Sequence, residues 1–343
     1  MLKNDKLYNF FLLSSAVMGI RRVSLVLLVF VFIFAGCSYE TENGPSQELS
    51  DTRTLMGTEV TITIITNDTT NGHLAIDSAF DAIGSVEDMM SSYRNNSELS
   101  RLNQEKKMEV SEPLSYNIKK SIHYSNISAG AFDISIDPIL KIWDNVKYTG
   151  KIPTEEEVNE TLNAVGWKRI NITGDVVQIG DDMSLNLGGI AKGYAIDMAI
   201  GSLISNKIKD ALVDAGGDIR TIGSKGGSPW RIALQNPRDK TQYLTIIDSF
   251  NGTVVTSGDY ERYFITDGKK IIHIADPRTG YSAEGLISVT IATSLLAIDA
   301  DALSTAVFVL GKDDGMKLVE SLDHVEALIV TEDGEVIRSS GFG

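Results

Sequence analysis

The sequence contains a single cysteine, at position 37, among its 343 residues. One cysteine cannot form an intramolecular disulfide or a cysteine-based zinc site, so disulfide-stapled and zinc-finger classes are excluded. Basic residues are also scarce, because 31 Lys and Arg stand against 46 Asp and Glu, for a net charge of −15. Proteins that bind nucleic acid need basic patches to neutralise phosphates. The charge balance therefore disfavours a nucleic-acid partner.

The amino-terminal segment lacks an apolar run of the ~18 residues that a membrane-spanning helix needs. Its apolar run, from Val23 to Ala35, follows Arg21-Arg22 and precedes Gly36-Cys37. A basic start, a short apolar stretch and small residues at its end are typical of a secretory signal peptide. We therefore expect residues 1–36 to be removed as a signal peptide, the alternative being an uncleaved anchor.

The only cysteine stands where this signal ends. The residues from Phe34 to Cys37 resemble a bacterial lipobox, in which the cysteine is lipidated and becomes the first residue of the mature chain. Residues 38–53 are polar and predict a flexible tether. We expect a lipidated Cys37 with its tether over 37–53, and an acidic domain over 54–343 that is lipid-anchored to a bacterial membrane or envelope, outside the cytoplasm. Translation starts at Met1 or at Met18.

Hydrophobic periodicity predicts a mixture of strands and helices in this domain. Alternating apolar and polar residues over 59–64 indicate a strand, and helical spacing indicates a helix over 73–91. Further helices are predicted over 113–128, 191–207 and 294–310, and strands over 211–214, 231–234, 243–247, 253–256, 263–266, 270–274, 327–331 and 336–339, with a hairpin over 167–179. Hairpins dominate and helices cluster, so we predict an α+β fold with mostly antiparallel sheet packed against helices.

A glycine-rich segment, Gly188 to Tyr194, opens one predicted helix. It has the glycine spacing of a phosphate loop, but Tyr-Ala follows where Lys and Ser or Thr should stand. Backbone N–H groups at such a helix start can still hold phosphate, and Lys192 would add a positive charge. A tight strand-to-helix turn explains the glycines equally well.

Two further features carry chemistry. Asp301 and Thr305 lie four residues apart in a predicted helix, so both oxygens share one face and suit Mg²⁺; alternatively, Asp299 or Asp301 caps the helix. His273 ends a predicted strand before the turn Asp276-Pro-Arg-Thr-Gly280, and it is the only histidine inside such a motif. Because a histidine is a neutral acceptor near neutral pH, His273 is the candidate general base.

An ordered set of motifs resembles the ApbE-type FAD:protein FMN transferases, a family of bacterial lipoproteins, and covers residues 54–343. The motifs are Met56–Thr58, Ser92–Asn103, Gly130–Asp133, Gly188–Ala195, Ala215–Asp218, Thr256–Arg262, His273–Gly280 and Ala300–Ala306. The resemblance implies a T-fold-like architecture, FAD as flavin donor and Mg²⁺ as cofactor. It also implies transfer of FMN through its phosphate to a Thr or Ser hydroxyl of an acceptor flavoprotein, with release of AMP.

The resemblance also implies site residues. Its flavin-contacting positions fall on Met56, Tyr93, Ala131, Phe132, Asp133, Asn186, Lys192 and Ala275. Its metal positions fall on the backbone oxygen of Gly189 and the side chains of Asp301 and Thr305, with Ser304 where some members have a ligand. Asn186 stands where the family usually has Asp, and Ala275 replaces a larger aliphatic residue.

Two other functions fit the same residues. A Mg²⁺-dependent FAD pyrophosphatase would give FMN and AMP with water as the nucleophile. A non-catalytic, lipid-anchored flavin-binding protein would retain FAD without forming AMP, although pure binding needs neither His273 nor Asp301. The chain itself has no obvious D-G-x-T-G-A/S acceptor motif, so its acceptor is expected to be another protein.

Overall fold

The structure is a computed structural model that describes residues 45–266 and 268–342. The predicted signal peptide, Cys37 and the first part of the predicted tether lie outside the described residues. No helix within the described ranges is both long enough and apolar enough to cross a membrane.

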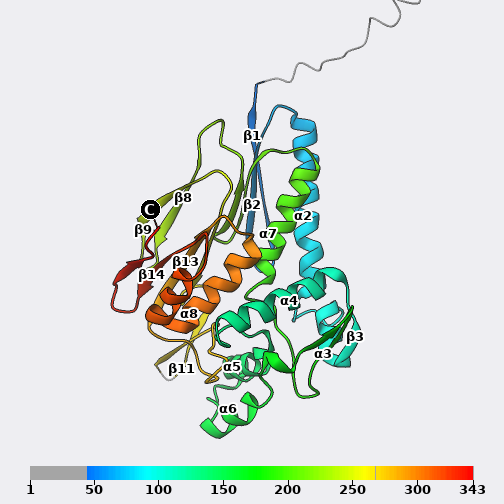
Figure 1. The fold of residues 1–343 in the computed structure, drawn as a ribbon, viewed down its shortest axis with the longest axis vertical. Coiled ribbons are helices and arrows are strands. Elements are labelled where there is room, and N and C mark those ends of the chain that lie inside the picture. The colour runs from blue at the N-terminus through cyan, green and yellow to red at the C-terminus, as the bar shows by residue number, and fades with distance from the viewer. Residues whose placement is uncertain (1–44, 267, 343) are drawn as a thin grey trace, which may run out of the picture. The chain divides into compact units, whose positions relative to one another are not determined.

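An eight-stranded sheet forms the centre of the fold, in the order β1-β2-β6-β7-β10-β13-β14-β15 (Figure 1). All of its neighbouring strands run antiparallel, as the α+β prediction requires. Its strands are β1 (Gln47–Leu55), β2 (Thr58–Thr66), β6 (Asp210–Ala215), β7 (Asp218–Ile222), β10 (Thr253–Gly258), β13 (Leu286–Thr293), β14 (Val325–Thr331) and β15 (Val336–Arg338).

Strand β1 corrects the predicted tether. Residues 47–53 were expected to be flexible, but they pair along their whole length with β2. Two hydroxyl pairs join the strands at 2.9 Å, Ser50 Oγ to Thr63 Oγ1 and Thr52 Oγ1 to Thr61 Oγ1. The strand is polar because it lies at the sheet edge with much of its surface in solvent, so it lacks the hydrophobic alternation that reveals a half-buried strand.

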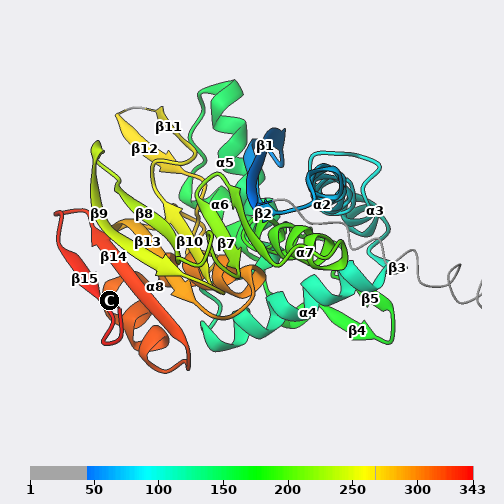
Figure 2. The ribbon, with the colours of Figure 1, turned by 90° about the horizontal axis from the view of Figure 1, so that it is seen from above.

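Helices cover one face of the sheet (Figure 2). The largest core cluster joins apolar residues of β2, β6 and β13 to residues of these helices. The elements are α2 (Thr69–Met90), α4 (Glu112–Ile127), α7 (Ala191–Ser205) and α8 (Ala297–Glu320), with α3 (Glu98–Glu105) and the small sheet β3 (Lys107–Glu109), β5 (Val176–Gln178) and β4 (Asn171–Thr173) beside them. The predicted helices over 73–91, 113–128 and 191–207 are thus confirmed to within a few residues.

The other face of the sheet packs against a hairpin of β8 (Trp230–Asn236) and β9 (Asp239–Ser249). Ile232 and Leu234 of this hairpin share a core with Val254, Leu328 and Val330 of the main sheet. A third, smaller core joins α5 (Asp137–Thr149) and α6 (Glu155–Leu162) to the hairpin of β11 (Tyr263–Thr266) and β12 (Lys269–Ile272).

Helices α7 and α8 approach each other closely at Gly193. A Cβ atom at this position would lie 2.2 Å from the carbonyl oxygen of Ala297 and 2.8 Å from Cβ of Asp301. Only glycine leaves the space for this contact, and it brings the start of α7 against the second turn of α8. These two helix segments carry most of the predicted metal positions.

We expect Gly193→Ala to lower the free energy of unfolding by about 1–3 kcal/mol or more, because it overpacks a rigid backbone contact. Gly201 of the same helix is the matched control, since its Cβ would have no neighbour nearer than 4.0 Å. Gly201→Ala should leave stability unchanged or raise it by up to about 1 kcal/mol through helix propensity. Denaturant unfolding measures both, and equal effects would contradict the close approach.

Candidate active site

Several loops meet at one end of the central sheet. The β1–β2 turn at Met56-Gly57 and the β6–β7 turn at Gly216-Gly217 lie at this end, and all four residues have positive φ. A Cβ at Gly216 would lie 2.3 Å from Thr58 Oγ1, so the two turns are in contact. Strand β10 also ends here, where Thr256 N donates to Asp218 Oδ1 at 3.1 Å.

The predicted metal positions lie together beside these turns. Asp301 is only 5 % exposed, and its Oδ2 accepts a hydrogen bond of 2.9 Å from Gly193 N. A Cβ at Gly189 would lie 3.2 Å from Thr305 Oγ1, which places the Gly189 backbone against that hydroxyl. The described residues contain no cluster of three His, Cys, Asp or Glu side chains that could hold a metal. A cation here would therefore have one carboxylate and neutral oxygens as ligands.

The electrostatics of Asp301 fit such a cation. Burial raises the pKa of this carboxyl, and the nearby charge of Asp218 raises it further, against the opposing effect of Lys192. A buried carboxylate beside a second one is stabilised in its ionised form by a positive charge. The oxygen donors of Gly189, Asp301 and Thr305 are those that Mg²⁺ prefers.

The first N–H groups of helix α8 are bound by a residue of another helix. Neither Asp299 nor Asp301 caps the helix. Instead, Asp197 of α7 accepts hydrogen bonds from Ala297 N at 2.8 Å and Ile298 N at 2.9 Å. Asp299 accepts from Lys120 Nζ at 2.6 Å and Tyr124 Oη at 2.7 Å, which ties α8 to α4. Asp301 thus remains free of a capping role.

Ser304 has its hydroxyl occupied by protein partners. It is fully buried, donates to the carbonyl of Asp301 at 2.9 Å and lies 2.8 Å from Ser257 Oγ of β10. These contacts fix α8 against the sheet. Metal ligation by Ser304 stays a prediction, since it would require this pair of hydrogen bonds to rearrange.

Lys192 lies at the start of α7 in an ion pair with Asp218, at 2.8 Å. Burial lowers the pKa of Lys192, but the charges of Asp218 and Asp301 outweigh it and raise the pKa to about 12. The ammonium group is therefore charged at neutral pH and fixed in place. Sequence reasoning did not assign Asp218 to the site, although its motif Ala215–Asp218 was part of the resemblance; an acidic residue directly after a glycine turn was the available signal.

His273 is held by the backbone of Arg262. The carbonyl oxygen of Arg262 lies 3.0 Å from His273 N and 3.1 Å from His273 Nδ1. An Nδ1–H that donates to this carbonyl leaves Nε2 as the acceptor. Burial lowers the pKa of His273 to about 4, and the charges of Arg262 and Lys192 add to this effect. The side chain still reaches solvent, so a neutral, accessible imidazole is present at neutral pH.

The predicted flavin positions fall into separate settings. Phe132 lies against Gly189, 3.2 Å from where a Cβ would stand, and Ala131 is buried beside it. Asp133 is buried with its carboxylate already bonded, to Ser135 N at 2.8 Å, Ser135 Oγ at 2.7 Å and Trp167 N at 2.9 Å. These hydrogen bonds fix the turn that follows Phe132, and flavin contact by Asp133 stays a prediction.

Asn186 connects two of these segments. Its Oδ1 accepts from Gly188 N at 2.9 Å, while Nδ2 donates to Asp137 Oδ1 at 3.1 Å and to Ser92 Oγ at 3.3 Å. A carboxylate at this position could not donate to Asp137, so the amide makes a hydrogen bond that an aspartate would lack. Ser92 precedes Tyr93, whose ring is 78 % exposed.

The two remaining flavin positions are Met56 and Ala275, the first and the last of these positions in the sequence. Met56 N donates to Glu87 Oε2 of α2 at 3.0 Å, which fixes the β1–β2 turn. Ala275 is 8 % exposed and packs in the small core with Trp143 and Ile271. Ala275 follows His273 by two residues in the sequence, but its side chain lies in the core of α5 and α6.

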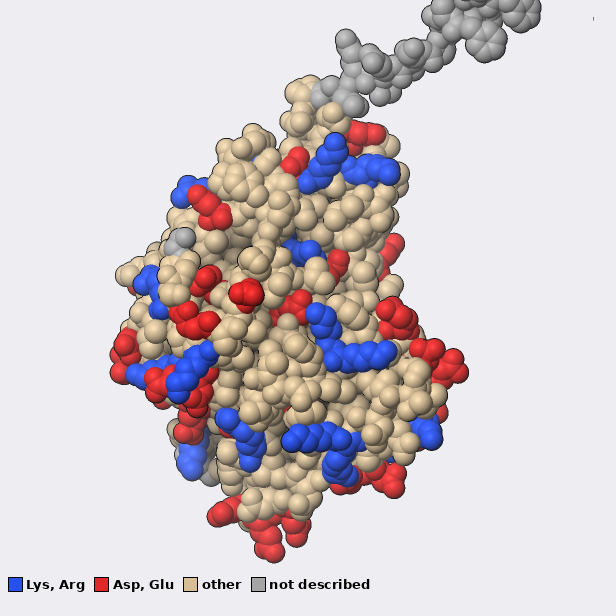
Figure 3. All heavy atoms as spheres, viewed as in Figure 1, with Lys and Arg blue, Asp and Glu red and all other residues tan. Residues whose placement is uncertain are grey.

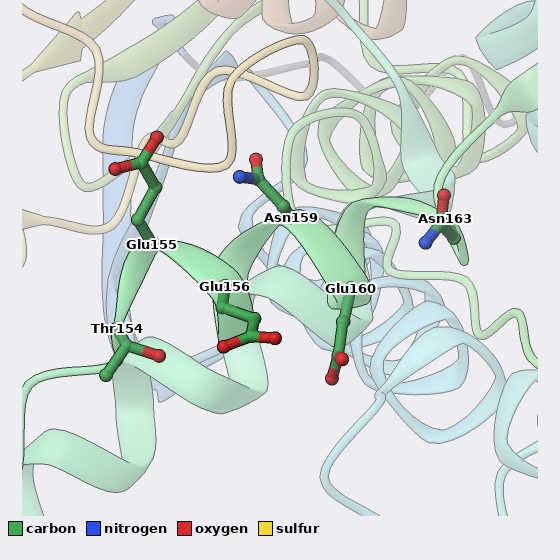
Figure 4. Close-up of a pocket in the computed structure, with 6 residues that line it drawn as sticks. All are labelled: Thr154, Glu155, Glu156, Asn159, Glu160 and Asn163. Atoms are coloured by element: carbon green, nitrogen blue, oxygen red, sulfur yellow. The ribbon is translucent and has the colours of Figure 1, made fainter.

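A hollow on α6 is unrelated to these residues. Figure 4 shows the side chains that line it, Thr154, Glu155, Glu156, Asn159, Glu160 and Asn163, and none of them is a predicted site residue. The acidic side chains that gather at the α6 end of the molecule are visible in Figure 3, where acidic and basic groups are otherwise interspersed over the face shown.

Comparison with known proteins assigns these motifs to one family. The model of the ApbE family matches residues 56–329. The FAD:protein FMN transferase of Vibrio cholerae is 32 % identical over 321 residues, covering 90 % of this chain and 94 % of its own length. The Haemophilus influenzae protein of the same name is 30 % identical over 266 residues, covering 73 % of this chain and 77 % of its own.

Solved structures agree with the sequence relatives. The ApbE protein of Thermotoga maritima superimposes with a TM-score of 0.80 at 34 % identity, over 86 % of this chain and 97 % of its own. The flavin transferase ApbE of Vibrio cholerae gives a TM-score of 0.74 at 29 % identity, over 87 % of this chain and 99 % of its own. The α+β fold, the ordered motifs and the family model lead to one conclusion: this chain belongs to the ApbE family.

Proposed function

We propose that this chain is an FAD:protein FMN transferase, which moves FMN from FAD to a Ser or Thr hydroxyl of a partner protein and releases AMP. The observation that carries the proposal is the match to a named transferase over 90 % of this chain. The convergence of Lys192, His273 and Asp301 at one end of the sheet supports it, because phosphoryl transfer depends mainly on positioning and charge neutralisation.

His273 is the residue that we assign to take the proton of the acceptor hydroxyl. A hydroxyl is a weak nucleophile at neutral pH and gains from an adjacent base. The Arg262 carbonyl fixes the ring so that Nε2 is the free acceptor. The low pKa keeps the ring neutral, and negative charge on a bound substrate would raise the proton affinity of the ring during the reaction.

Asp301, Thr305 and the carbonyl of Gly189 are the residues that would hold Mg²⁺. The ion would supply charge neutralisation on the pyrophosphate of FAD. Lys192 contributes a fixed positive charge from the start of α7, where the backbone N–H groups of the first turn also favour an anion. Asp218 keeps the ammonium group in place through its 2.8 Å ion pair.

Product analysis with and without an acceptor tests the proposal against hydrolysis. A transferase should release AMP at a rate that rises with the concentration of an acceptor protein carrying a D-G-x-T-G-A/S segment, and should leave the flavin covalently bound to it. Release of free FMN and AMP that is indifferent to the acceptor would identify a pyrophosphatase. Retention of FAD without AMP would identify a flavin-binding protein.

We further propose that the mature protein is a lipoprotein anchored to a bacterial membrane through Cys37. The lipobox-like segment Phe34–Cys37 supports this proposal, as does the short apolar run before it. With β1 beginning at Gln47, the tether between lipid and domain would span residues 38–46.

Cys37→Ala is expected to abolish lipid labelling, because the thiol is the only side chain of its kind in the sequence. The variant protein should accumulate either unprocessed or in the soluble fraction. Metabolic labelling with a palmitate analogue measures this directly, with Ser38→Ala as the control. Undiminished labelling of the Cys37 variant would contradict the lipid anchor.

A further inference from the structure

Arg262 differs from most arginines in the described ranges because it is in no ion pair, a property that it shares with Arg101 and Arg338. Most of the others are in ion pairs: Arg53 with Asp51 and Asp77, Arg94 with Glu87 and Asp88, Arg169 with Asp182, Arg220 with Asp197, Arg231 with Asp248, Arg238 with Asp259 and Arg278 with Asp276. No ion pair within the described ranges involves Arg262, although acidic residues outnumber basic ones in the whole sequence. A guanidinium that is left unpaired in an acidic protein is available for an anionic ligand.

The segment that carries Arg262 is held rigidly. Asp259 is buried and binds Arg238 through two hydrogen bonds, of 2.9 and 2.6 Å, and Lys270 Nζ at 2.7 Å. The Arg262 carbonyl oxygen also contacts both His273 N and His273 Nδ1. These contacts fix the Arg262 backbone beside His273, and therefore the position from which its side chain extends.

The guanidinium reaches the turn that carries a predicted flavin position. Nη2 of Arg262 lies 3.2 Å from where a Cβ of Gly57 would stand, next to Met56. The absent side chain at Gly57 is therefore what admits the guanidinium to this turn. The backbone of Arg262 therefore lies at His273, and its guanidinium lies at the Met56-Gly57 turn.

The carboxylates near Lys192 reduce the attraction that its single positive charge offers to an anion. Lys192 is surrounded by the carboxylates of Asp218, Asp301 and Glu261, all of which act on its pKa. An anionic pyrophosphate that approaches Lys192 would therefore be repelled by more than one carboxylate. Arg262 lies close enough to His273 for its positive charge, together with that of Lys192, to lower the pKa of the ring.

We propose that Arg262 binds the pyrophosphate of FAD, with its guanidinium donating to phosphate oxygens between the Met56-Gly57 turn and His273. Arginine suits this ligand because its planar fork matches two phosphate oxygens at once. That the pyrophosphate belongs to FAD rests on the proposed function. Nothing in the Arg262 assignment requires the transfer step itself.

Binding measurements on Arg262→Gln test this role without relying on turnover. The substitution keeps the backbone carbonyl that holds His273, so the base remains in place. We expect the dissociation constant for FAD to rise by about 10- to 100-fold, the loss typical of a charge-assisted hydrogen bond pair. The dissociation constant for riboflavin, which has no phosphate, should stay within about two-fold of wild type. Titration at fixed ionic strength by flavin fluorescence measures both.

Two further variants make the result specific. Arg262→Lys keeps the charge but loses the fork, so we expect an intermediate affinity for FAD. The matched control is Arg338→Gln, which also removes an exposed arginine. Arg338 lies on β15, at the opposite edge of the sheet from β1, so this variant should change the dissociation constant of neither FAD nor riboflavin. Thermal unfolding of each variant confirms that the fold is intact.

Two other outcomes would overturn the assignment, and a third would separate it from the proposed function. Equal losses for FAD and riboflavin would mean that Arg262 supports the flavin ring or the turn rather than phosphate. Unchanged FAD binding with a raised KM for the acceptor would place the guanidinium against an acidic acceptor protein. If wild-type protein releases no AMP but shows the contrast between FAD and riboflavin, the proposed function fails while Arg262 remains the phosphate ligand.

Discussion

His273→Ala is expected to slow FMN transfer by about 10²- to 10⁴-fold, the usual contribution of a general base. The affinities for FAD and for Mg²⁺ should change little, because the ring bonds only to the Arg262 backbone and not to any predicted flavin or metal position. Single-turnover measurement of covalent flavin on the acceptor gives the rate. Flavin fluorescence gives the affinity on the same preparation.

His73, which is exposed on α2, provides the matched control for loss of an imidazole. His73→Ala should transfer FMN at the wild-type rate. If His273 served only to close the turn after β12, its variant would instead lose thermal stability with a nearly unchanged rate. A folded His273→Ala protein that binds FAD and transfers at the wild-type rate would remove this residue from the mechanism.

The pH dependence follows from the same assignment. A base is active when unprotonated, and the pKa of His273 is lowered to about 4. With Mg²⁺ saturating, kcat/KM for the free enzyme should therefore hold through the usual histidine range near 6.5 and fall only as the pH approaches the lowered value. An acid limb centred at the ordinary histidine pKa would contradict the lowered pKa of His273.

Asp301→Ala is expected to abolish Mg²⁺-dependent turnover while FAD binding hardly changes. The reason is that Asp301 is the only carboxylate in the predicted donor set with Gly189 and Thr305. A second readout is the rise in melting temperature that Mg²⁺ gives to the wild-type protein by binding the folded state. The variant should lose this rise.

Two companion variants separate ligation from folding. Asp301→Asn retains an oxygen that can accept from Gly193 N, so it should fold even where the alanine variant leaves that N–H buried without a partner. Asp313→Ala, at an exposed position of α8, should keep both turnover and the Mg²⁺-induced rise. If chelation with EDTA leaves wild-type AMP release untouched, the metal assignment is wrong.

Local patterns predicted several of the half-buried and regular parts of the fold, although strand β13 and helix α5 were not among the predicted elements. Alternation revealed β2 because Val60, Ile62 and Ile64 are fully buried. The i, i+4 spacing placed Asp301 and Thr305 on one face of α8, and the structure brings that face against Gly189. Strand β1 and helix α6 were not predicted, because their residues are mainly polar and give no hydrophobic periodicity. Helix α6 has a single buried side chain, Val158.

Contacts between distant segments could not be read from the sequence. The cap of α8 comes from Asp197, a hundred residues earlier, so inspection of the residues around Asp299 could not find it. The dependence of Lys192 on Asp218, and of His273 on the Arg262 carbonyl, likewise arises only when the loops meet at the sheet end. The family resemblance supplied the site positions, and the fold supplies the reasons why they are held there.

The central claim is tested most directly by the stoichiometry of the two products in one reaction. The protein is incubated with FAD, Mg²⁺ and an acceptor protein that presents a D-G-x-T-G-A/S segment, and a second acceptor carries valine in place of the threonine. The account predicts equal amounts of AMP and of covalently bound flavin with the first acceptor, and neither beyond background with the second. AMP formed in equal amounts with both acceptors, without covalent flavin, would contradict it.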